Sequence, residues 1–417
     1  MIVPLVEADA GECGGKAGAL GALLRAGLPV PGGFVVPFAA YRAAAGALGP
    51  RGFAGAAGPD ATRRAIEARP LHATVLGALE SALVELGDPP VAVRSSAAGE
   101  DTGQASAAGQ YESFLAVRGA GAVAGAVRAC WASLFSPRAI GYRDVSGERP
   151  AGDPVMAVIV QRHLDAEVSG VMFTPADPGG ATTIEASWGL GPSVAGGEVT
   201  PDAYRVRGDG PVSRSVAGKR TRLDRHGARL VRREVPAGDR ERPALDDAAV
   251  ARLAGLGAEI AAVRGGPQDI EWAIAGGRVW ILQARPVTAA PPPPAAPSRP
   301  AAEGLTGTPG SRGTVTGAAR IVRGPGDFAR VRAGDILVCP FTDPAWTPLL
   351  RVAAGVVTEA GGVLSHAAIV AREYGIPAVL GVPDATSRLR DGAVITIDGA
   401  LGTVAAAGAR PDPSGAR

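Results

Sequence analysis

Residues 269–287, DIEWAIAGGRVWILQARPV, read as two β-strands joined by a glycine turn. Apolar and polar side chains alternate on both sides of Gly276 and Gly277, which is the pattern of an antiparallel hairpin with one buried face. Glycine favours a tight turn here because it reaches positive φ values without strain. The length of the turn decides which side chains lie opposite each other.

The polar face of this hairpin is the first candidate site. A three-residue loop places Glu271 directly opposite Gln283, and it puts Asp269 and Arg285 on the same face. A two-residue loop places Glu271 and Gln283 on opposite faces. In the first register a carboxylate and a carboxamide oxygen lie side by side, which suits Mg²⁺, and Arg285 can meet a phosphate. The alternative is a surface hairpin with solvated polar side chains.

Two glycine-rich loops are candidates for phosphate binding. An apolar strand ends in Arg94 and Ser95, and glycine, alanine and serine dominate from there to residue 110. The segment GECGGKAGALGALL, residues 11–24, has the same character and contains Lys16 just after two glycines. Small residues let backbone N–H groups approach a polyphosphate closely. Loose loops without a ligand are the alternative in a chain with 60 glycines.

Lysine is nearly absent from the chain. Of 42 basic residues, only Lys16 and Lys219 are not arginine. A compact ammonium group can do what a planar guanidinium cannot, so both positions are candidates for a specific role. For Lys219 the alternative is a lysine retained by chance on a solvated face.

Composition limits the class of protein. At 417 residues the chain is long enough for two or three domains, and its net charge of +2 gives no basic stripe for nucleic acid. Apolar runs are too short to span a membrane, so we expect a soluble, cytoplasmic protein. The three cysteines have no CxxC spacing, which disfavours both disulfides and a zinc site.

A proline-rich segment divides the chain. Six of the fifteen residues in AAPPPPAAPSRPAAE, 289–303, are proline, which predicts an extended spacer between a large N-terminal part and a small C-terminal part. The small part reads as a compact α/β unit with a helix that begins after Ser365. Its strands are predicted at 335–341, 354–360, 393–399 and 402–407.

His366 lies where that predicted helix begins, within GGVLSHAAIVAREYGIPAVLG, residues 361–381. The glycines allow a tight loop, Ser365 can cap the helix, and Gly375 is suited to end it. A neutral imidazole nitrogen is a nucleophile at pH 7, and the N–H groups of a helix start attract anions. The other histidines, His72, His163 and His226, have no such setting and are interpreted as structural or surface residues.

Taken in order, the motifs resemble the phosphoenolpyruvate synthase, pyruvate phosphate dikinase and rifampicin phosphotransferase family. Besides the hairpin and the His366 segment, the motifs are GGKAGALGALLRAGLPVPGGFVV (14–36), AVRSSAAGEDTGQASAAGQYESFL (92–115), CWASLFSPRAIGYR (130–143), SGVMFTP (169–175), EASWGLGPSVAGGEVTPDAY (185–204) and TDPAWTPLL (342–350). They cover the chain from residue 14 to about residue 404.

The resemblance implies an α/β and α+β architecture. Residues 1–288 would form an ATP-grasp nucleotide-binding domain, 289–303 a linker, and 304–417 a small swivelling β/β/α phosphohistidine domain. The long members of the family have a further acceptor-binding domain, and no segment of this sequence resembles one. The acceptor would therefore be a small molecule bound between the domains or would lie on a separate protein.

The resemblance also assigns roles to residues. ATP and Mg²⁺ are the implied cofactors, and His366 is the implied catalytic residue that accepts the β-phosphoryl group of ATP. Glu271 and Gln283 would bind the metal. The implied nucleotide-binding residues are Lys16, Arg94, Ser95, Gly109 in the 102–110 loop, Gln161 near the adenine, Asp269 and Arg285.

The implied activity is that of a dikinase-type phosphotransferase, which splits ATP to AMP and phosphate and passes a phosphoryl group through His366 to an acceptor. One alternative is a ligase that activates a carboxyl or carbonyl group by phosphorylation in a biosynthetic pathway. The other is a nucleotide-binding remnant without catalysis. Nucleic acid and membrane are not expected partners.

Overall fold

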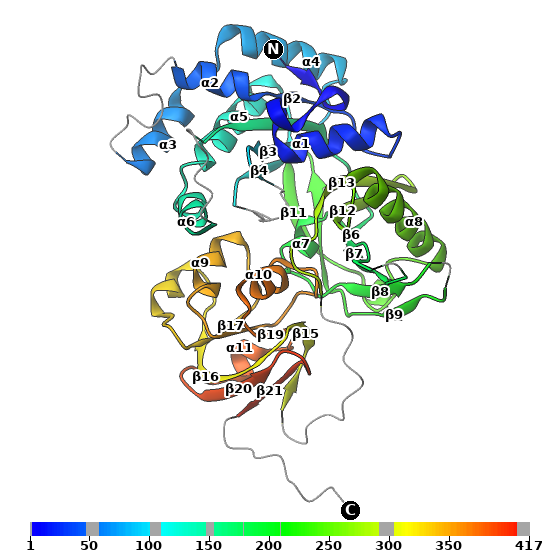
Figure 1. Cartoon of the computed structure of the whole chain (residues 1–417), viewed down its shortest axis with the longest axis vertical. Coiled ribbons are helices and arrows are strands. Elements are labelled where there is room, and N and C mark those ends of the chain that lie inside the picture. The colour runs from blue at the N-terminus through cyan, green and yellow to red at the C-terminus, as the bar shows by residue number, and fades with distance from the viewer. Residues whose placement is uncertain are drawn as a thin grey trace, which may run out of the picture. The chain divides into compact units, whose positions relative to one another are not determined.

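The structure is a computed structural model of the chain, and it forms two compact units (Figure 1). The first unit contains Met1–Gly191 and Asp202–Thr288, and the second contains Pro192–Pro201 and Ala289–Arg417. The structure describes residues 2–46, 58–100, 110–146, 154–177, 179–208, 210–291 and 304–406.

The first unit contains a five-stranded sheet with the order β1-β2-β5-β3-β4. Helices cover one face of this sheet, where they pack on buried aliphatic side chains of β3 and β5. The strands are β1 (Val3–Pro4), β2 (Gly33–Val36), β3 (Val91–Ala97), β4 (Ser113–Val117) and β5 (Met156–Arg162), and the helices on that face are α2 (Phe38–Gly46), α3 (Pro59–Ala68), α4 (Ala73–Glu85) and α5 (Ala120–Ser133).

The other face of the five-stranded sheet shares a core with helix α1 (Ala10–Arg25) and a second, six-stranded sheet. That sheet has the order β13-β12-β6-β7-β8-β9, and helix α8 (Asp247–Arg264) packs against it. Its strands are β6 (Val168–Phe173), β7 (Thr182–Trp188), β8 (Asp202–Val206), β9 (Ser213–Ser215), β12 (Gln268–Ala275) and β13 (Arg278–Pro286). Strands β10 (Thr221–His226) and β11 (Arg229–Glu234) form a separate hairpin.

The β12–β13 hairpin has the predicted pairing but not the predicted turn. Glu271 is opposite Gln283, and Asp269 is opposite Arg285. The expected three-residue loop is wrong, because Ala275 pairs with Arg278 and only two glycines, both with positive φ, form the turn. A β-bulge between Glu271 and Trp272 shifts the register by one residue and restores the pairing that a longer loop would have given.

Lys219 is neither a surface residue nor a candidate for ligand binding. Its side chain is fully buried, and its ammonium group donates to Asp202 Oδ1 at 2.6 Å and to the Ala217 carbonyl at 3.0 Å. Asp202 also accepts from the Ala217 and Ala244 amides and from the Tyr204 hydroxyl. Because the ammonium is small, it fits among these backbone groups where a planar guanidinium would need more room. This pair therefore fastens two loops to β8.

His163 is a buried histidine of the first unit. Its side chain is 3% exposed, and burial lowers its pKa more strongly than Asp165, 4.0 Å away, raises it. The unfolded chain therefore binds a proton that the folded chain does not, and stability falls as the pH drops below the ordinary value near 6.5. We expect His163→Gln to flatten this part of the pH profile, whose slope cannot exceed about 1.4 kcal/mol per pH unit.

Urea denaturation between pH 5 and pH 8 measures this slope. His72→Gln is the control, since His72 is exposed and serves only as the N-cap of α4. The prediction would be contradicted if His163→Gln left the slope of the free energy of unfolding against pH unchanged, or if His72→Gln reduced that slope equally.

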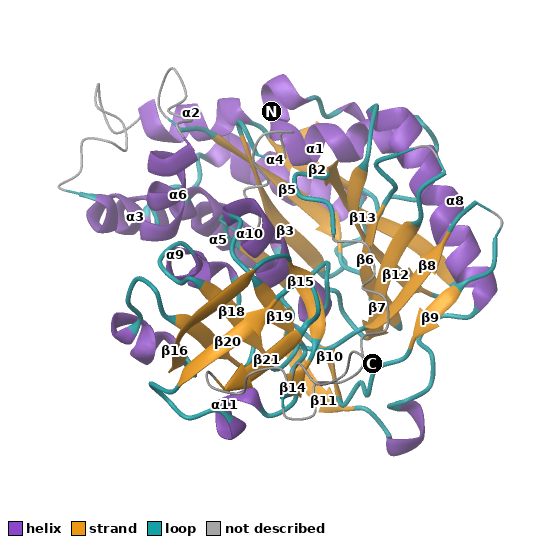
Figure 2. Cartoon of the chain, turned by 60° about the horizontal axis from the view of Figure 1, so that its bottom comes forward, coloured by secondary structure: helices purple, strands orange, loops and turns teal. Residues whose placement is uncertain are grey.

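The second unit is built on an eight-stranded sheet with the order β14-β21-β20-β16-β17-β18-β19-β15 (Figure 2). Strands β16 to β19 are parallel to their neighbours in that order, and the outer strands are antiparallel. The strands are β14 (Leu305–Thr306), β15 (Thr308–Ser311), β16 (Thr314–Ile321), β17 (Ile336–Cys339), β18 (Gly355–Thr358), β19 (Ala378–Leu380), β20 (Val394–Asp398) and β21 (Thr403–Ala406). The four predicted strands and the predicted helix are confirmed.

Two cores sandwich the parallel strands of this unit. On one side they pack against α9 (Thr347–Leu350) and α10 (His366–Tyr374). On the other side they pack against side chains of β20, β21 and helix α11 (Ala385–Arg388), because the sheet folds back on itself. The result is the expected β/β/α layering.

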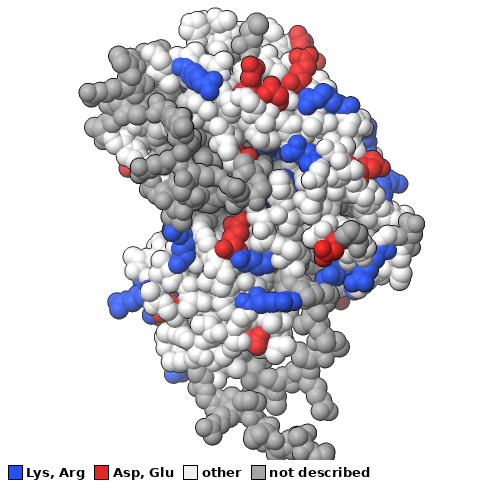
Figure 3. All heavy atoms as spheres, viewed as in Figure 1, with Lys and Arg blue, Asp and Glu red and all other residues white. Residues whose placement is uncertain are grey.

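Charges of both signs are mixed on one face of the molecule. On the face shown in Figure 3, acidic and basic side chains of the described residues are interspersed. The three cysteines are buried free thiols, and burial raises the pKa of Cys13 to about 11 and that of Cys130 still further. Buried free thiols agree with the expectation of no disulfide and act as small apolar packing residues. Within the described ranges, every helix is too short or too polar to cross a bilayer.

Candidate functional site

Arg94 connects the two sheets of the first unit. It lies on β3, and its Nη2 donates to Glu271 Oε2 at 3.0 Å and to Gln283 Oε1 at 2.8 Å. Its Nη1 donates to the Leu282 carbonyl at 2.6 Å, at the bulged part of β13. The carboxylate and the carboxamide oxygen thus converge on one cationic nitrogen, so three predicted site residues from opposite parts of the sequence are brought together.

Arg285 and Asp269 form a second, buried pair on the same hairpin. The Arg285 Nε and Nη2 atoms both donate to Asp269 Oδ2, at 2.9 and 2.7 Å. The two residues are only 9% and 5% exposed, so the carboxylate fixes the guanidinium in place. Asp269 and Arg285 lie opposite each other on β12 and β13, two residues along each strand from the Glu271–Gln283 pair.

Lys16 is positioned by a break in helix α1. Gly14 has φ 82° and ψ 165°, so the helix restarts just before Lys16. A Cβ atom on Gly14 would lie 2.4 Å from the Ser96 carbonyl oxygen, so only glycine permits this approach of α1 to β3. Lys16 is 6% exposed, and its ammonium donates to the Ser95 carbonyl at 3.2 Å.

Glu100 is a site residue that the sequence did not reveal. Its Oε1 accepts from Lys16 Nζ at 2.7 Å, and its Oε2 accepts from the Ala97 amide at 2.9 Å. Glu100 is 5% exposed, so this ion pair is buried. The only sequence signal was its place in the quoted GED segment after the strand.

Ser95 and Gln161 take structural roles in this geometry. Ser95 provides its carbonyl to Lys16, and strand alternation points its side chain to the opposite face from Arg94. The hydroxyl at the α1 contact belongs instead to Ser96, which accepts from the Ala17 amide at 3.0 Å. Gln161, on β5, is buried and donates to the Pro31 carbonyl at 2.9 Å. Gly109 lies outside the described residues.

The metal prediction fits the donor set of the hairpin. Glu271 and Gln283 direct oxygens at one point, which here holds the cationic Arg94 nitrogen. Among the described residues, no three His, Cys, Asp or Glu side chains form a metal-binding group. A carboxylate and a carboxamide suffice for Mg²⁺ only when phosphate oxygens and water complete its coordination, which is the usual arrangement in nucleotide sites.

His366 is the first residue of α10 in the second unit, and it is buried at 5% exposure. Its Nδ1 lies 3.0 Å from the Thr342 hydroxyl, and its Nε2 lies 3.2 Å from the Thr347 hydroxyl. Both ring nitrogens therefore have hydroxyl partners, which fixes the plane of the ring. The two threonines come from TDPAWTPLL, a motif whose function the sequence alone did not reveal.

The loop before His366 is held differently from the prediction. Ser365 occupies the N-cap position, but its hydroxyl donates to the Gly362 carbonyl at 2.8 Å and makes no capping hydrogen bond to the helix. The predicted side-chain cap is therefore wrong, because the hydroxyl bonds a carbonyl of the same tight loop instead. Arg372 also donates to the Val363 carbonyl at 2.8 Å. Gly375 ends the helix in the left-handed conformation, as predicted.

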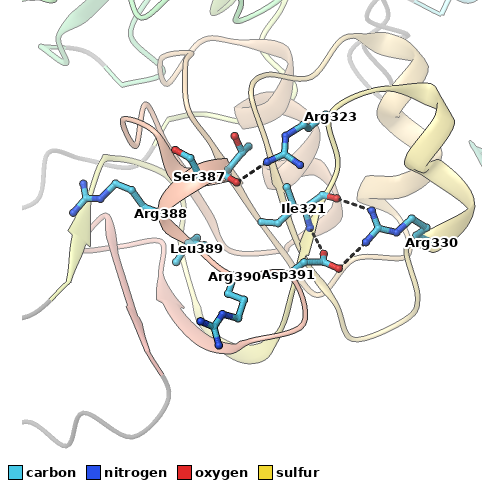
Figure 4. Close-up of a pocket in the computed structure, with 9 residues that line it drawn as sticks. Ile321, Arg323, Arg330, Ser387, Arg388, Leu389, Arg390 and Asp391 are labelled. Atoms are coloured by element: carbon cyan, nitrogen blue, oxygen red, sulfur yellow. Dashed lines mark hydrogen bonds and ion pairs between the residues drawn. The ribbon is translucent and has the colours of Figure 1, made fainter.

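A hollow of about 650 Å³ lies elsewhere in the second unit (Figure 4). Four arginines line it, but Arg330 is bound to Asp391 and Arg323 to the Thr386 carbonyl. In Figure 4 the Arg388 and Arg390 side chains extend away from Ile321 at its centre. These contacts hold two turns together, and the lining contains neither histidine nor cysteine.

Comparison with known proteins gives two family matches. Residues 10–301 match the model of the pyruvate phosphate dikinase, AMP/ATP-binding domain. Residues 331–402 match the PEP-utilising enzyme, mobile domain. The first match includes the Arg94, Lys16 and hairpin residues, and the second includes His366 and both of its threonine partners.

Several curated relatives are named phosphoenolpyruvate synthase. The probable phosphoenolpyruvate synthase of Methanothermobacter thermautotrophicus is 38% identical, over 95% of this chain and 61% of the relative. The enzyme of Aeropyrum pernix is 36% identical over 94% of this chain and 56% of its own length. That of Archaeoglobus fulgidus is 40% identical over 75% of this chain and 43% of its own length.

The chain thus spans about half the length of the curated relatives that it matches. The predicted fold class is confirmed, with an ATP-grasp-type nucleotide-binding unit and a mobile phosphohistidine-type unit. The family match covers most of the chain and includes the residues that the site geometry brings together. The chain therefore belongs to the family of the pyruvate phosphate dikinase AMP/ATP-binding domain, here combined with a PEP-utilising mobile domain.

Proposed function

We propose that this protein is an ATP-dependent, dikinase-type phosphotransferase in which His366 receives the β-phosphoryl group of ATP and passes it to an acceptor. One observation supports the proposal above all. A single chain combines cations and paired oxygens in a nucleotide-binding unit with a buried, hydroxyl-bonded histidine in a mobile unit.

The cations of the first unit would bind and orient the polyphosphate. Lys16, Arg94 and Arg285 are each held by a carboxylate: Glu100, Glu271 and Asp269 respectively. Phosphoryl transfer depends mainly on positioning and on neutralising charge at the transferring oxygens. Cations that are already held in place supply this positioning and charge neutralisation with little reorganisation of the site. Lys16 and Arg94 would exchange part of their carboxylate contacts for phosphate oxygens.

Glu271 and Gln283 would hold Mg²⁺. When bound, the metal neutralises charge on the phosphates and fixes their geometry. Arg94 would then release the two oxygens, and its guanidinium would be available to the nucleotide. Ser95, Gln161 and Gly109 remain proposed contacts of the nucleotide.

The acceptor is proposed to be a small molecule. The name shared by the relatives makes phosphoenolpyruvate the first product to test, and an acceptor on a separate protein is the second possibility. We also propose that the protein is cytoplasmic. In the proposed division, residues 1–288 bind the nucleotide, residues 289–303 are the linker, and residues 304–417 form the domain that carries the phosphoryl group.

Labelled ATP tests the proposal. The protein is incubated with Mg²⁺ and ATP labelled at the β or the γ phosphate, and the protein-bound label is then tested for acid lability. We expect stable label under alkali, loss under acid, and incorporation from the β position only. Attack on the β phosphorus expels AMP and water then releases the γ phosphate, so γ label that is retained on the protein, or no label from either position, would contradict a dikinase mechanism.

The metal residues give a separate prediction. Glu271→Ala and Gln283→Ala should each reduce Mg²⁺-dependent labelling by on the order of 10²-fold or more, since each removes a ligand that positions the phosphates. Labelling measured against Mg²⁺ concentration checks this. Glu167→Ala is the control, because Glu167 is exposed and its carboxylate only accepts from the Gly276 amide in the same hairpin turn. Wild-type Mg²⁺ dependence in both site variants would refute the metal assignment.

A further inference from the structure

The hollow of the second unit concentrates positive charge away from His366 (Figure 4). Two segments of the chain form it. The turn after β16 contributes Arg323 and Arg330, and the segment that begins at helix α11 contributes Arg388 and Arg390. Its volume of about 650 Å³ is in the range of small-molecule sites. Neither His366 nor a residue that bonds its ring lines the hollow, so the phosphoryl carrier does not account for it.

One of the four guanidinium groups is already neutralised. Arg330 Nη2 donates to Asp391 Oδ2 at 2.6 Å, and Arg330 Nη1 donates to Asp327 Oδ1 at 3.3 Å. Asp391 also accepts from the Ile321 amide at 2.9 Å and from Arg320 Nη1 at 3.4 Å. Among the described lining residues Asp391 is the only carboxylate, and these structural contacts occupy it.

The other three arginines lack a carboxylate partner within the part of the chain that the structure describes. Arg323 donates to the Thr386 carbonyl at 3.0 Å, which holds the guanidinium in place but does not neutralise it. Arg388 and Arg390 are exposed, and neither forms an ion pair with a described residue. A guanidinium group stays protonated at every physiological pH. The hollow therefore carries three positive charges that no neighbouring carboxylate balances.

The chemistry of the lining indicates the class of ligand. Guanidinium groups bind phosphate oxygens through pairs of N–H donors, and these charge-assisted hydrogen bonds are among the strongest in proteins. Ile321, which is 4% exposed, and Leu389 add apolar surface between the two arginine-bearing segments. Three positive charges and an apolar wall fit a small molecule that has more than one negative phosphate charge.

We propose that this hollow is a binding site for a small phosphorylated molecule with two or more phosphate charges, held by Arg323, Arg388 and Arg390. In Figure 4 the Arg388 and Arg390 side chains extend away from Ile321, and no printed bond would have to break for them to turn toward a ligand. The proposal uses no residue of the nucleotide-binding hairpin and no contact of His366. It therefore stands or falls independently of the dikinase function.

Methyl NMR of the full chain tests binding at the hollow itself. Isoleucine methyl groups are labelled with ¹³C, and Ile321→Val assigns the signal of Ile321. Inorganic pyrophosphate is the probe, and the ionic strength is held constant because salt screens exposed charges. We expect a saturable shift of the Ile321 signal. Inorganic phosphate should bind at least about tenfold more weakly than pyrophosphate, because one phosphate group cannot reach both segments.

Two sets of variants identify the groups that bind. Replacing both exposed arginines, Arg388→Gln with Arg390→Gln, should weaken pyrophosphate binding by about tenfold or more, since each loss removes a charge-assisted hydrogen bond. Arg312→Gln is the matched control, because Arg312 is an exposed arginine of the same unit, between β15 and β16, outside the hollow. An unshifted Ile321 signal in the ligand-free double variant confirms that the hollow is still folded.

Pyrophosphate can also reach the cations of the first unit, so Lys16→Gln separates the two sites. The Ile321 shift should persist in that variant with wild-type affinity. Loss of the shift in Lys16→Gln would show that the signal arises from the nucleotide site, and it would overturn the proposal. The proposal would also be refuted by no saturable shift up to about 5 mM pyrophosphate, by equal affinity for phosphate and pyrophosphate, or by wild-type affinity in the double variant.

Discussion

Replacing His366 with alanine is expected to abolish incorporation of β-labelled phosphate completely. The imidazole is the proposed nucleophile, and alanine offers no group that can form the N–P bond. Nucleotide binding should be retained, because the proposed phosphate contacts lie in the first unit, which contains Lys16, Arg94 and Arg285. Labelling in alkaline gels and ATP binding by isothermal titration calorimetry measure the two properties separately.

His226→Ala is the matched control for this loss. His226 is an exposed histidine at the end of β10, and its removal should leave labelling at the wild-type level. Residual β-labelling in His366→Ala above that of a no-enzyme control would show that another residue accepts the phosphoryl group. Loss of ATP binding in the same variant would show that the effect is not confined to the carrier step.

The second large effect concerns stability. Asp202→Ala is expected to lower the free energy of unfolding by about 3–5 kcal/mol, because it leaves the Lys219 ammonium buried without its carboxylate. The substitution also removes the acceptor for the Ala217 and Ala244 amides and the Tyr204 hydroxyl. Urea denaturation followed by circular dichroism measures the loss.

An exposed ion pair provides the control. Arg214 and Asp247 lie 2.5 Å apart with side chains 40% and 62% exposed, so Arg214→Ala should change the free energy of unfolding by no more than about 0.5 kcal/mol. Replacing both partners, Asp202→Leu with Lys219→Met, should recover part of the lost stability, since no buried charge then remains. A loss below about 1 kcal/mol in Asp202→Ala would mean that the pair is not sealed from water.

The hairpin shows how far local pattern can reach. Alternation and the two glycines predicted both strands and the pairing of Glu271 with Gln283, and the pairing is confirmed. The turn length was wrong, because a bulge at Glu271 and Trp272 absorbs the extra residue of β13. A bulge depends on how the hairpin joins the rest of the sheet, here through the pairing of β12 with β6, and local alternation does not encode that pairing.

Partners of charged residues were the least predictable feature. The scarcity of lysine marked Lys16 and Lys219 as unusual, but it could not distinguish a residue in a candidate ligand site from one in a buried structural pair. Lys219 meets Asp202 across 17 residues, and Lys16 meets Glu100 across 84. Such pairings depend on which loops share a desolvated space, which is decided by packing of the whole unit.

By itself, the sequence indicated the hairpin, the strands and helix of the small part, the family resemblance and the identity of the candidate nucleophile. These depend on periodicity, glycine and proline positions, and motifs, all of which are local along the chain. Only the tertiary structure decided the partners of each reactive group: Arg94 between Glu271 and Gln283, and His366 between two threonines 24 and 19 residues away. The physical reason is that hydrogen bonds and ion pairs act over about 3 Å, so their formation depends on how distant segments pack together.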